Sequence, residues 1–106
     1  MKKIICYGDS NTYGYNPDTG GRYGKNHRWT GLLSKILGSE YRVIEEGCNN
    51  RTGFHNNTDG IKQSGQLYLR TCLKEYFDSD IFIYALGTND LQKFYATLQA
   101  LALGEP

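Results

Sequence analysis

The feature that most constrains the fold is a near-continuous apolar run at 80–86, Asp80-Ile81-Phe82-Ile83-Tyr84-Ala85-Leu86. Strands covered on both faces, as in parallel sheets, lack the apolar and polar alternation of half-exposed strands. The run therefore predicts a buried strand of the kind found at the centre of a parallel sheet. An apolar run at 3–7 predicts a second buried strand, and the shorter, more polar run at 41–46 predicts a strand nearer the sheet edge.

Segments with helical spacing of apolar residues separate the three predicted strands. The segment 28–37 ends at Gly38, a residue that commonly stops a helix, and its apolar residues are expected to form one buried face. A looser helical pattern covers 66–77, and 93–103 predicts the start of a further helix. The apolar residues of the first two segments are Trp29, Leu32, Leu33, Ile36 and Leu37, and Leu67, Leu69, Leu73 and Phe77. Strands alternating with helices predict an α/β fold with a parallel sheet and right-handed crossovers.

Composition limits the classes of partner. With 106 residues, 39% of them hydrophobic, and a net charge of +1, the chain fits one small soluble globular domain. Its scattered basic residues form no stripe for nucleic acid, and no segment approaches the roughly 20 apolar residues of a membrane span. We therefore expect a cytoplasmic protein with no nucleic-acid or membrane partner. The three cysteines form no C-x-x-C pair, which predicts reduced thiols, with Cys6 and Cys72 in the core and Cys48 as a candidate reactive thiol.

Polar clusters follow each of the three predicted strands. They read Gly8-Asp9-Ser10-Asn11, Asn49-Asn50-Arg51-Thr52-Gly53 and Gly87-Thr88-Asn89-Asp90. Each could be a simple turn or helix cap, but the carboxyl ends of parallel strands meet at one edge of a sheet, where ligands bind. Acyl transfer needs a nucleophile and donors aimed at the developing oxyanion. Ser10 is the candidate nucleophile, the Asn89 side-chain amide is a candidate donor, and the middle cluster can supply a backbone N–H.

These clusters resemble the motifs of the GDSL or SGNH hydrolases, in particular Gly-Asp-Ser after the first strand and Gly-x-Asn-Asp after a later one. Further blocks are similar to the arylesterase and acyltransferase branch, so that the resemblance covers nearly all of residues 3–95. These blocks are Trp29-Thr30-Gly31-Leu32-Leu33, Glu45-Glu46-Gly47, Asn50-Arg51-Thr52, Gly65-Gln66-Leu67-Tyr68-Leu69 with Cys72-Leu73, and Leu86-Gly87-Thr88-Asn89-Asp90-Leu91.

The resemblance implies a three-layer flavodoxin-like α/β fold and hydrolysis of carboxylic esters through an acyl-serine, without metal or organic cofactor. Ser10 would be the nucleophile and an oxyanion donor through its backbone N–H, and Asn89 the side-chain donor. Asn50 stands where the family commonly has glycine and would supply the remaining N–H, with Gly47 as the second candidate. Asp9 and Asp90 are expected to hold their loops by hydrogen bonds rather than to act as bases.

The family's catalytic Asp and His come from a later Asp-x-x-His block, which these 106 residues do not contain. His27 and His55 are weaker candidates for a base, so we expect weak or no activity from this chain as written. In the family's strand order 2-1-3-4-5, strands 2-1-3 are present here and later ones missing, which would leave the strand at 81–86 with an exposed edge. Three explanations would account for that edge: a partner copy pairs with it, another polypeptide completes the domain, or the sequence is cut short of the gene product.

Two other functions remain open. A noncatalytic ligand-binding or interaction module could keep the pocket without the base, and a flavodoxin-like nucleotide or flavin binder would share the fold but needs glycine spacing that Gly8-Asp9-Ser10-Asn11 lacks. For the esterase, short-acyl esters are the expected substrates. Aromatic residues in and beside the loops would suit small or aryl esters, namely Tyr13, Tyr15, Tyr23, Trp29 and Phe54.

Overall fold

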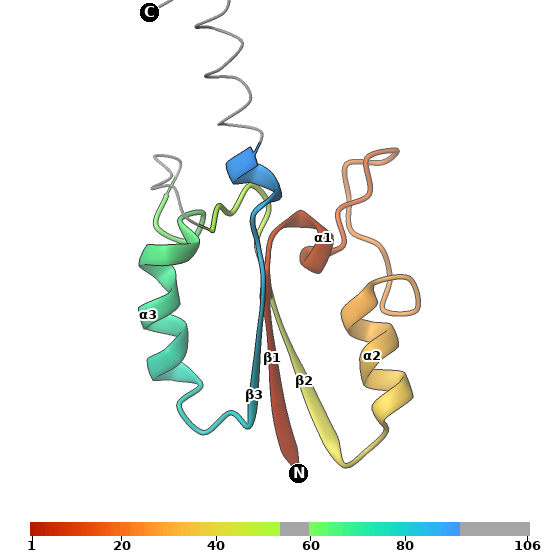
Figure 1. Cartoon of the computed structure of the whole chain (residues 1–106). Coiled ribbons are helices and arrows are strands. Elements are labelled where there is room, and N and C mark those ends of the chain that lie inside the picture. The colour runs from red at the N-terminus through yellow and green to blue at the C-terminus, as the bar shows by residue number, and fades with distance from the viewer. Residues whose placement is uncertain (54–59, 92–106) are drawn as a thin grey trace, which may run out of the picture.

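A computed structural model describes residues 1–53 and 60–91 as a layered α/β unit (Figure 1). Its described sheet has the strand order β2-β1-β3, formed by β1 (Lys2–Gly8), β2 (Tyr41–Gly47) and β3 (Ile81–Ala85), all parallel. Helix α2 (Trp29–Leu37) lies on one face and α3 (Gly65–Glu75) on the other. The predicted fold class and strand order are confirmed. The helix predicted at 93–103 lies outside the described residues.

Strand β1 is the centre of the described sheet and supplies most of its core. Ile4, Ile5, Cys6 and Tyr7 are all buried, because β1 has a strand on either side and a helix over each face. Gly8, its last residue, pairs with Gly47 of β2 and with Ala85 of β3. The three carboxyl ends are therefore level, so the loops that follow them begin at one edge of the sheet.

A short helix, α1 (Ser10–Tyr13), runs close over the ends of β1 and β2. A Cβ atom on Gly8 would lie 2.0 Å from Thr12 Oγ1, and one on Gly47 would lie 2.3 Å from the backbone nitrogen of Tyr13. Both distances are far below van der Waals contact, so only glycine permits this approach. The two glycines thus place Ser10 directly at the end of the central strand.

Helix α3 leaves most of the apolar residues of its helical pattern exposed. Cys72 is buried and Tyr68 and Tyr76, four residues to either side, are partly buried, whereas Leu67, Leu73 and Phe77 are exposed. The tyrosines can bury their rings because their hydroxyl groups find partners, as when Tyr76 Oη donates to Glu46 Oε2 at 2.9 Å. On α2, Leu32 and Ile36 are exposed, so the expectation that the apolar residues of 28–37 form one buried face was wrong for these two.

Strand β3 is less buried than its apolar sequence predicts. Ile81 is 47% exposed and Tyr84 is 39% exposed, although the run 80–86 has the composition of an inner strand. In the described sheet β3 has β1 as its one hydrogen-bonded neighbour, which leaves its other edge open. The exposed edge expected from the family's strand order is therefore present in the described residues.

Candidate active site

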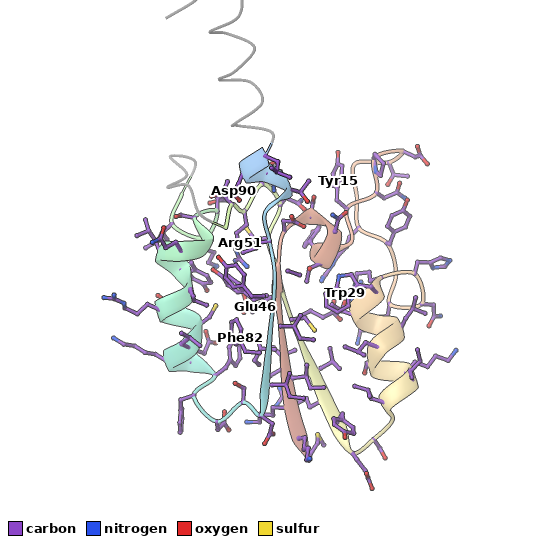
Figure 2. The ribbon with its side chains drawn as sticks, in the orientation of Figure 1. Tyr15, Trp29, Glu46, Arg51, Phe82 and Asp90 are labelled. Atoms are coloured by element: carbon purple, nitrogen blue, oxygen red, sulfur yellow. The ribbon has the colours of Figure 1, made fainter. Side chains whose placement is uncertain are left out.

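The loops after β1, β2 and β3 meet in a pocket of about 350 Å³ at the carboxyl edge of the sheet. Its described lining consists of Ser10, Tyr15, Asn49, Asn50 and Asn89. Figure 2 shows Tyr15 and Asp90 at this end of the molecule, beside α1 and at the end of β3. The structure thus brings together the candidate nucleophile and both asparagines that the sequence singled out.

Ser10 owes its position to the cap of α1. Asp9 is buried as the N-cap residue, and its Oδ1 atom accepts a hydrogen bond from the backbone N–H of Asn11 at 3.0 Å. Asp9 therefore occupies a capping role while its neighbour Ser10, only partly buried, lines the pocket. One tetrapeptide thus supplies both a helix cap and a residue of the pocket lining, which the sequence had left as alternatives.

Asn50 has a left-handed backbone, with φ of 66°, and is the one non-glycine residue with positive φ in the described part of the chain. Asparagine enters this region more readily than most residues, and glycine enters it freely. The geometry explains how Asn50 can occupy a position where the related motif commonly has glycine. Asn50 is one of the residues that line the pocket.

The next residue, Arg51, is fully buried and anchors this loop between the sheet and α3 (Figure 2). Its guanidinium donates to the carbonyl oxygens of Lys62 (2.6 Å), Glu46 (2.7 Å) and Gly8 (3.3 Å). The same group lies over the ring of Tyr7, 4.3 Å from its centroid. From the sequence, Arg51 stands out only as part of a motif, because nothing in the neighbouring residues indicates that this arginine is buried.

Asn89 and Asp90 tie the third loop to the second. Asn89 Nδ2 donates to the carbonyl oxygen of Arg51 at 2.9 Å, which determines which end of the amide is the donor. An amide nitrogen carries two hydrogens, so this pocket-lining side chain has the capacity for a second donated hydrogen bond. Asp90 Oδ1 accepts from the backbone N–H of Gly53 at 2.5 Å, and Tyr84 Oη donates to the Gly53 carbonyl at 2.8 Å. Like Asp9, Asp90 has a hydrogen bond that holds a loop.

Other candidates lie elsewhere. Gly47 is absent from the described lining of the Ser10 pocket and packs its backbone against α1. His27 is exposed and stacks beside Tyr23, with ring centroids 6.5 Å apart, while His55 lies outside the described residues. Asn49, which the sequence reasoning passed over as a site residue, lines the pocket, and its Oδ1 atom is buried without a hydrogen-bond partner in the described part.

The chemistry of the described pocket is that of a hydroxyl surrounded by neutral amides. Its described lining includes neither a histidine nor a carboxylate. Residues 1–53 and 60–91 contain no group of three or more His, Cys, Asp or Glu side chains that could hold a metal ion. Within the same ranges, no helix has the length and apolar character needed to cross a membrane.

The cysteines differ in environment. Cys6 and Cys72 are fully buried, as predicted for core residues, and burial raises the pKa of each thiol to about 11. Cys48 is only partly buried, and its Sγ lies 3.7 Å from the Asn49 carbonyl oxygen. The described residues hold three free thiols.

The chain is similar to one protein family and to several solved structures. Residues 6–103 match the GDSL-like lipase/acylhydrolase family. Among solved structures, a carbohydrate acetylesterase family member from Sinorhizobium meliloti is 38% identical, with a TM-score of 0.78, over 86% of this chain and 43% of that chain. The aryl esterase of M. smegmatis is 39% identical, with a TM-score of 0.77, over 85% and 44%. A putative arylesterase from Agrobacterium tumefaciens str. C58 is 34% identical, with a TM-score of 0.81, over 89% and 46%.

The chain thus spans less than half the length of each of these structures. A search among curated proteins found no match.

Proposed function

The chain belongs to the GDSL-like lipase/acylhydrolase family, and from this premise we propose that it carries the nucleophile and oxyanion donors of a serine-dependent esterase or acyltransferase. The observation that carries the proposal is the pocket in which Ser10, Asn50 and Asn89 meet from three separate loops. No metal or organic cofactor enters the proposed reaction.

In the proposed reaction, Ser10 Oγ attacks the carbonyl carbon of an ester. The carbonyl oxygen becomes an oxyanion, which the backbone N–H groups of Ser10 and Asn50 and the side-chain amide of Asn89 stabilise. A base takes the serine proton and delivers it to the departing alcohol, leaving an acyl-serine. Water then releases the carboxylic acid, or a second alcohol takes the acyl group.

The proposed reaction needs a base that accepts the serine proton, and no such base was identified in this chain. They contain no Asp-x-x-His sequence, and the described pocket has no base in its lining. Known triads that lose one member keep only about 10³–10⁴-fold catalysis over water, through binding and the oxyanion donors. We therefore propose that this chain alone is a weak ester hydrolase or an inactive one.

The proposed substrates are short-acyl esters with a small or aryl alcohol. The pocket volume of about 350 Å³ suits a small molecule, and Tyr15 offers an aromatic wall. Three of the similar structures bear names of acetylesterases or arylesterases, which supports the same class. A cytoplasmic location is proposed on the composition alone.

The open edge of β3 is proposed to pair with further polypeptide of the same fold. Support comes from the exposed apolar residues of β3 and from the similar structures, which are more than twice as long as the part this chain covers. Sedimentation of the purified chain tests this edge. A monomer that pairs with an added polypeptide spanning the remaining family strands would support the proposal, and a stable dimer would instead assign the edge to a second copy.

The catalytic proposal is tested by hydrolysis of p-nitrophenyl acetate by the full chain, Ser10→Ala and Ser34→Ala. Ser34 is an exposed helix residue and serves as the matched control. We expect Ser10→Ala to abolish the enzyme-dependent rate and Ser34→Ala to retain it. An enzyme-dependent rate that Ser10→Ala leaves unchanged would overturn Ser10 as nucleophile, whereas the absence of any enzyme-dependent rate in the unmodified chain is the result expected of a chain that lacks the base. Ester-analogue binding that survives in both variants without turnover would favour the noncatalytic binding module.

A further inference from the structure

One wall of the Ser10 pocket is carried by a small hairpin, residues 14–23, in the loop after α1. Tyr15 and Arg22 form an antiparallel bridge within it, and the Tyr23 N–H donates to the Gly14 carbonyl at 2.7 Å. The N–H of Tyr15 also donates to the carbonyl oxygen of Ser10 at 2.9 Å. The 14–23 hairpin therefore presents Tyr15 directly beside the candidate nucleophile.

Two arginines hold the 14–23 hairpin at its open end. Arg22 Nε donates to the Tyr13 carbonyl at 2.6 Å, and its guanidinium lies 4.5 Å from the centroid of the Tyr13 ring. Arg28, which is buried, donates from Nη1 to the Tyr23 carbonyl at 2.8 Å. The two arginines thus hydrogen-bond to the backbone immediately before the hairpin, at Tyr13, and at its last residue, Tyr23.

Both arginines converge on Glu45 of β2. Arg28 binds its carboxylate with two nitrogens, Nε to Oε2 at 2.9 Å and Nη2 to Oε1 at 3.0 Å, and Arg22 Nη2 binds Oε2 at 3.0 Å. The Glu45 side chain is 18% exposed, so these ion pairs are screened less than surface pairs. Burial raises the pKa of Glu45, but the two arginines together outweigh this and hold the pKa below its usual range.

We propose that Glu45 is a positioning residue which, through Arg22 and Arg28, holds the 14–23 hairpin and so sets the Tyr15 wall of the pocket. This inference rests on the proposed esterase function of Ser10. Strand β2 is paired with β1 along its whole length, whereas the described backbone–backbone hydrogen bonds of the hairpin lie within it or run to Ser10 of α1. When Glu45 of β2 holds Tyr15 in place through the two arginines, the pocket should bind esters of planar aryl alcohols better than esters of small alkyl alcohols, because aryl groups stack on an aromatic ring.

The first test measures the hairpin itself and needs no catalysis. Amide hydrogen exchange is followed by NMR at Tyr23 and at Asn16, whose N–H donates to the Gly21 carbonyl within the hairpin at 2.9 Å. It is measured in the full chain, in Arg22→Gln and in Glu45→Gln. Arg22→Gln is the milder change, because it leaves the buried pair of Arg28 and Glu45 intact. We expect exchange about tenfold faster in both variants. Unchanged exchange would overturn the proposal, whatever the activity of the protein.

The second test measures substrate selection with phenyl acetate and ethyl acetate. In Arg22→Gln we expect KM for phenyl acetate to rise about fivefold, the scale of one aromatic contact, with kcat for ethyl acetate within about twofold of the unmodified chain. Arg22→Lys, which keeps the charge, should restore part of the KM. Equal KM increases for both esters would overturn Tyr15 as a selective wall.

The control is Asp78→Asn, which removes an ion pair with Lys3 remote from the pocket, beside the start of β1. It should change neither hairpin exchange nor KM. Failure of the esterase proposal appears separately, as enzyme-dependent ester hydrolysis that Ser10→Ala leaves unchanged, and the exchange experiment would still test the role of Glu45.

Discussion

Replacing Arg51 by alanine should destabilise the protein more than any surface change. The substitution removes a buried guanidinium that donates to three carbonyl oxygens and lies over the ring of Tyr7. The Gly8 carbonyl keeps a second donor, the Cys48 N–H at 3.1 Å. The Glu46 carbonyl lies within the β1–β2 ladder, so the Lys62 carbonyl is the acceptor that depends most on this donor.

The magnitude follows from these losses. A polar group left unpaired on burial costs about 1–3 kcal/mol, and a desolvated cation over an aromatic ring contributes about 1–2 kcal/mol. Some water will reach the Lys62 carbonyl, since that residue is exposed. We expect Arg51→Ala to lower the free energy of unfolding by about 2–5 kcal/mol, a large part of the 5–15 kcal/mol typical of a domain.

Urea unfolding followed by the fluorescence of Trp29 measures this loss. Trp29 is the single tryptophan, and its Nε1 lies 3.3 Å from Thr12 Oγ1, so its emission reports on the region where α1 and α2 meet. Arg70→Ala is the matched control, because Arg70 is exposed on α3 and should change stability by no more than about 0.5 kcal/mol. A loss below about 1 kcal/mol for Arg51→Ala would refute the reasoning that this arginine anchors the loop.

Three further outcomes are expected. Asp90→Ala should lower the free energy of unfolding in urea by about 1–3 kcal/mol, because it leaves the buried Gly53 N–H without this acceptor. Asp90→Asn keeps an acceptor and should lower it by less, and equal losses for the two variants would contradict this. The lowered pKa of Glu45 means that its ion pairs stabilise the fold above its usual pKa of 4.5 and lose that effect as pH falls through the lowered value. The difference in unfolding free energy between the unmodified chain and Glu45→Gln should therefore shrink below pH 4.5, and a difference that stays constant would refute it. In native protein at pH 8, a thiol reagent should modify Cys48 first, and equally rapid labelling of Cys6 would contradict its burial.

Much of the fold was predictable because it depends on patterns within short segments. The apolar runs at 3–7 and 80–86 and the helical spacing at 28–37 identify strands and a helix locally, and their order implies a parallel sheet. The faces of the helices were harder to predict. In α3 the leucines suggested one face, but Cys72 is the buried residue and Tyr68 is partly buried, with its ring centroid 5.3 Å from the Arg51 guanidinium.

The residues of the candidate site were likewise predictable only in part. Ser10 and Asn89 could be proposed because polar clusters after parallel strands must meet, and the structure places both at one pocket. Their catalytic roles stay predictions. Arg51 and Glu45 could not be placed, since an arginine or glutamate has the same local signature whether it is buried in an ion-pair network or solvated.

By itself, the sequence determined the order of the elements, the edge of the sheet that carries the site, and the residue types that meet there. Only the tertiary structure decided the left-handed backbone of Asn50, the burial of Arg51 and the side of the sheet to which each glutamate of the Glu45-Glu46 pair turns. The physical reason is that propensity and periodicity act over a few residues. Burial, ion pairing and backbone strain depend instead on which distant segments pack together, as the loops after β1, β2 and β3 do around Ser10.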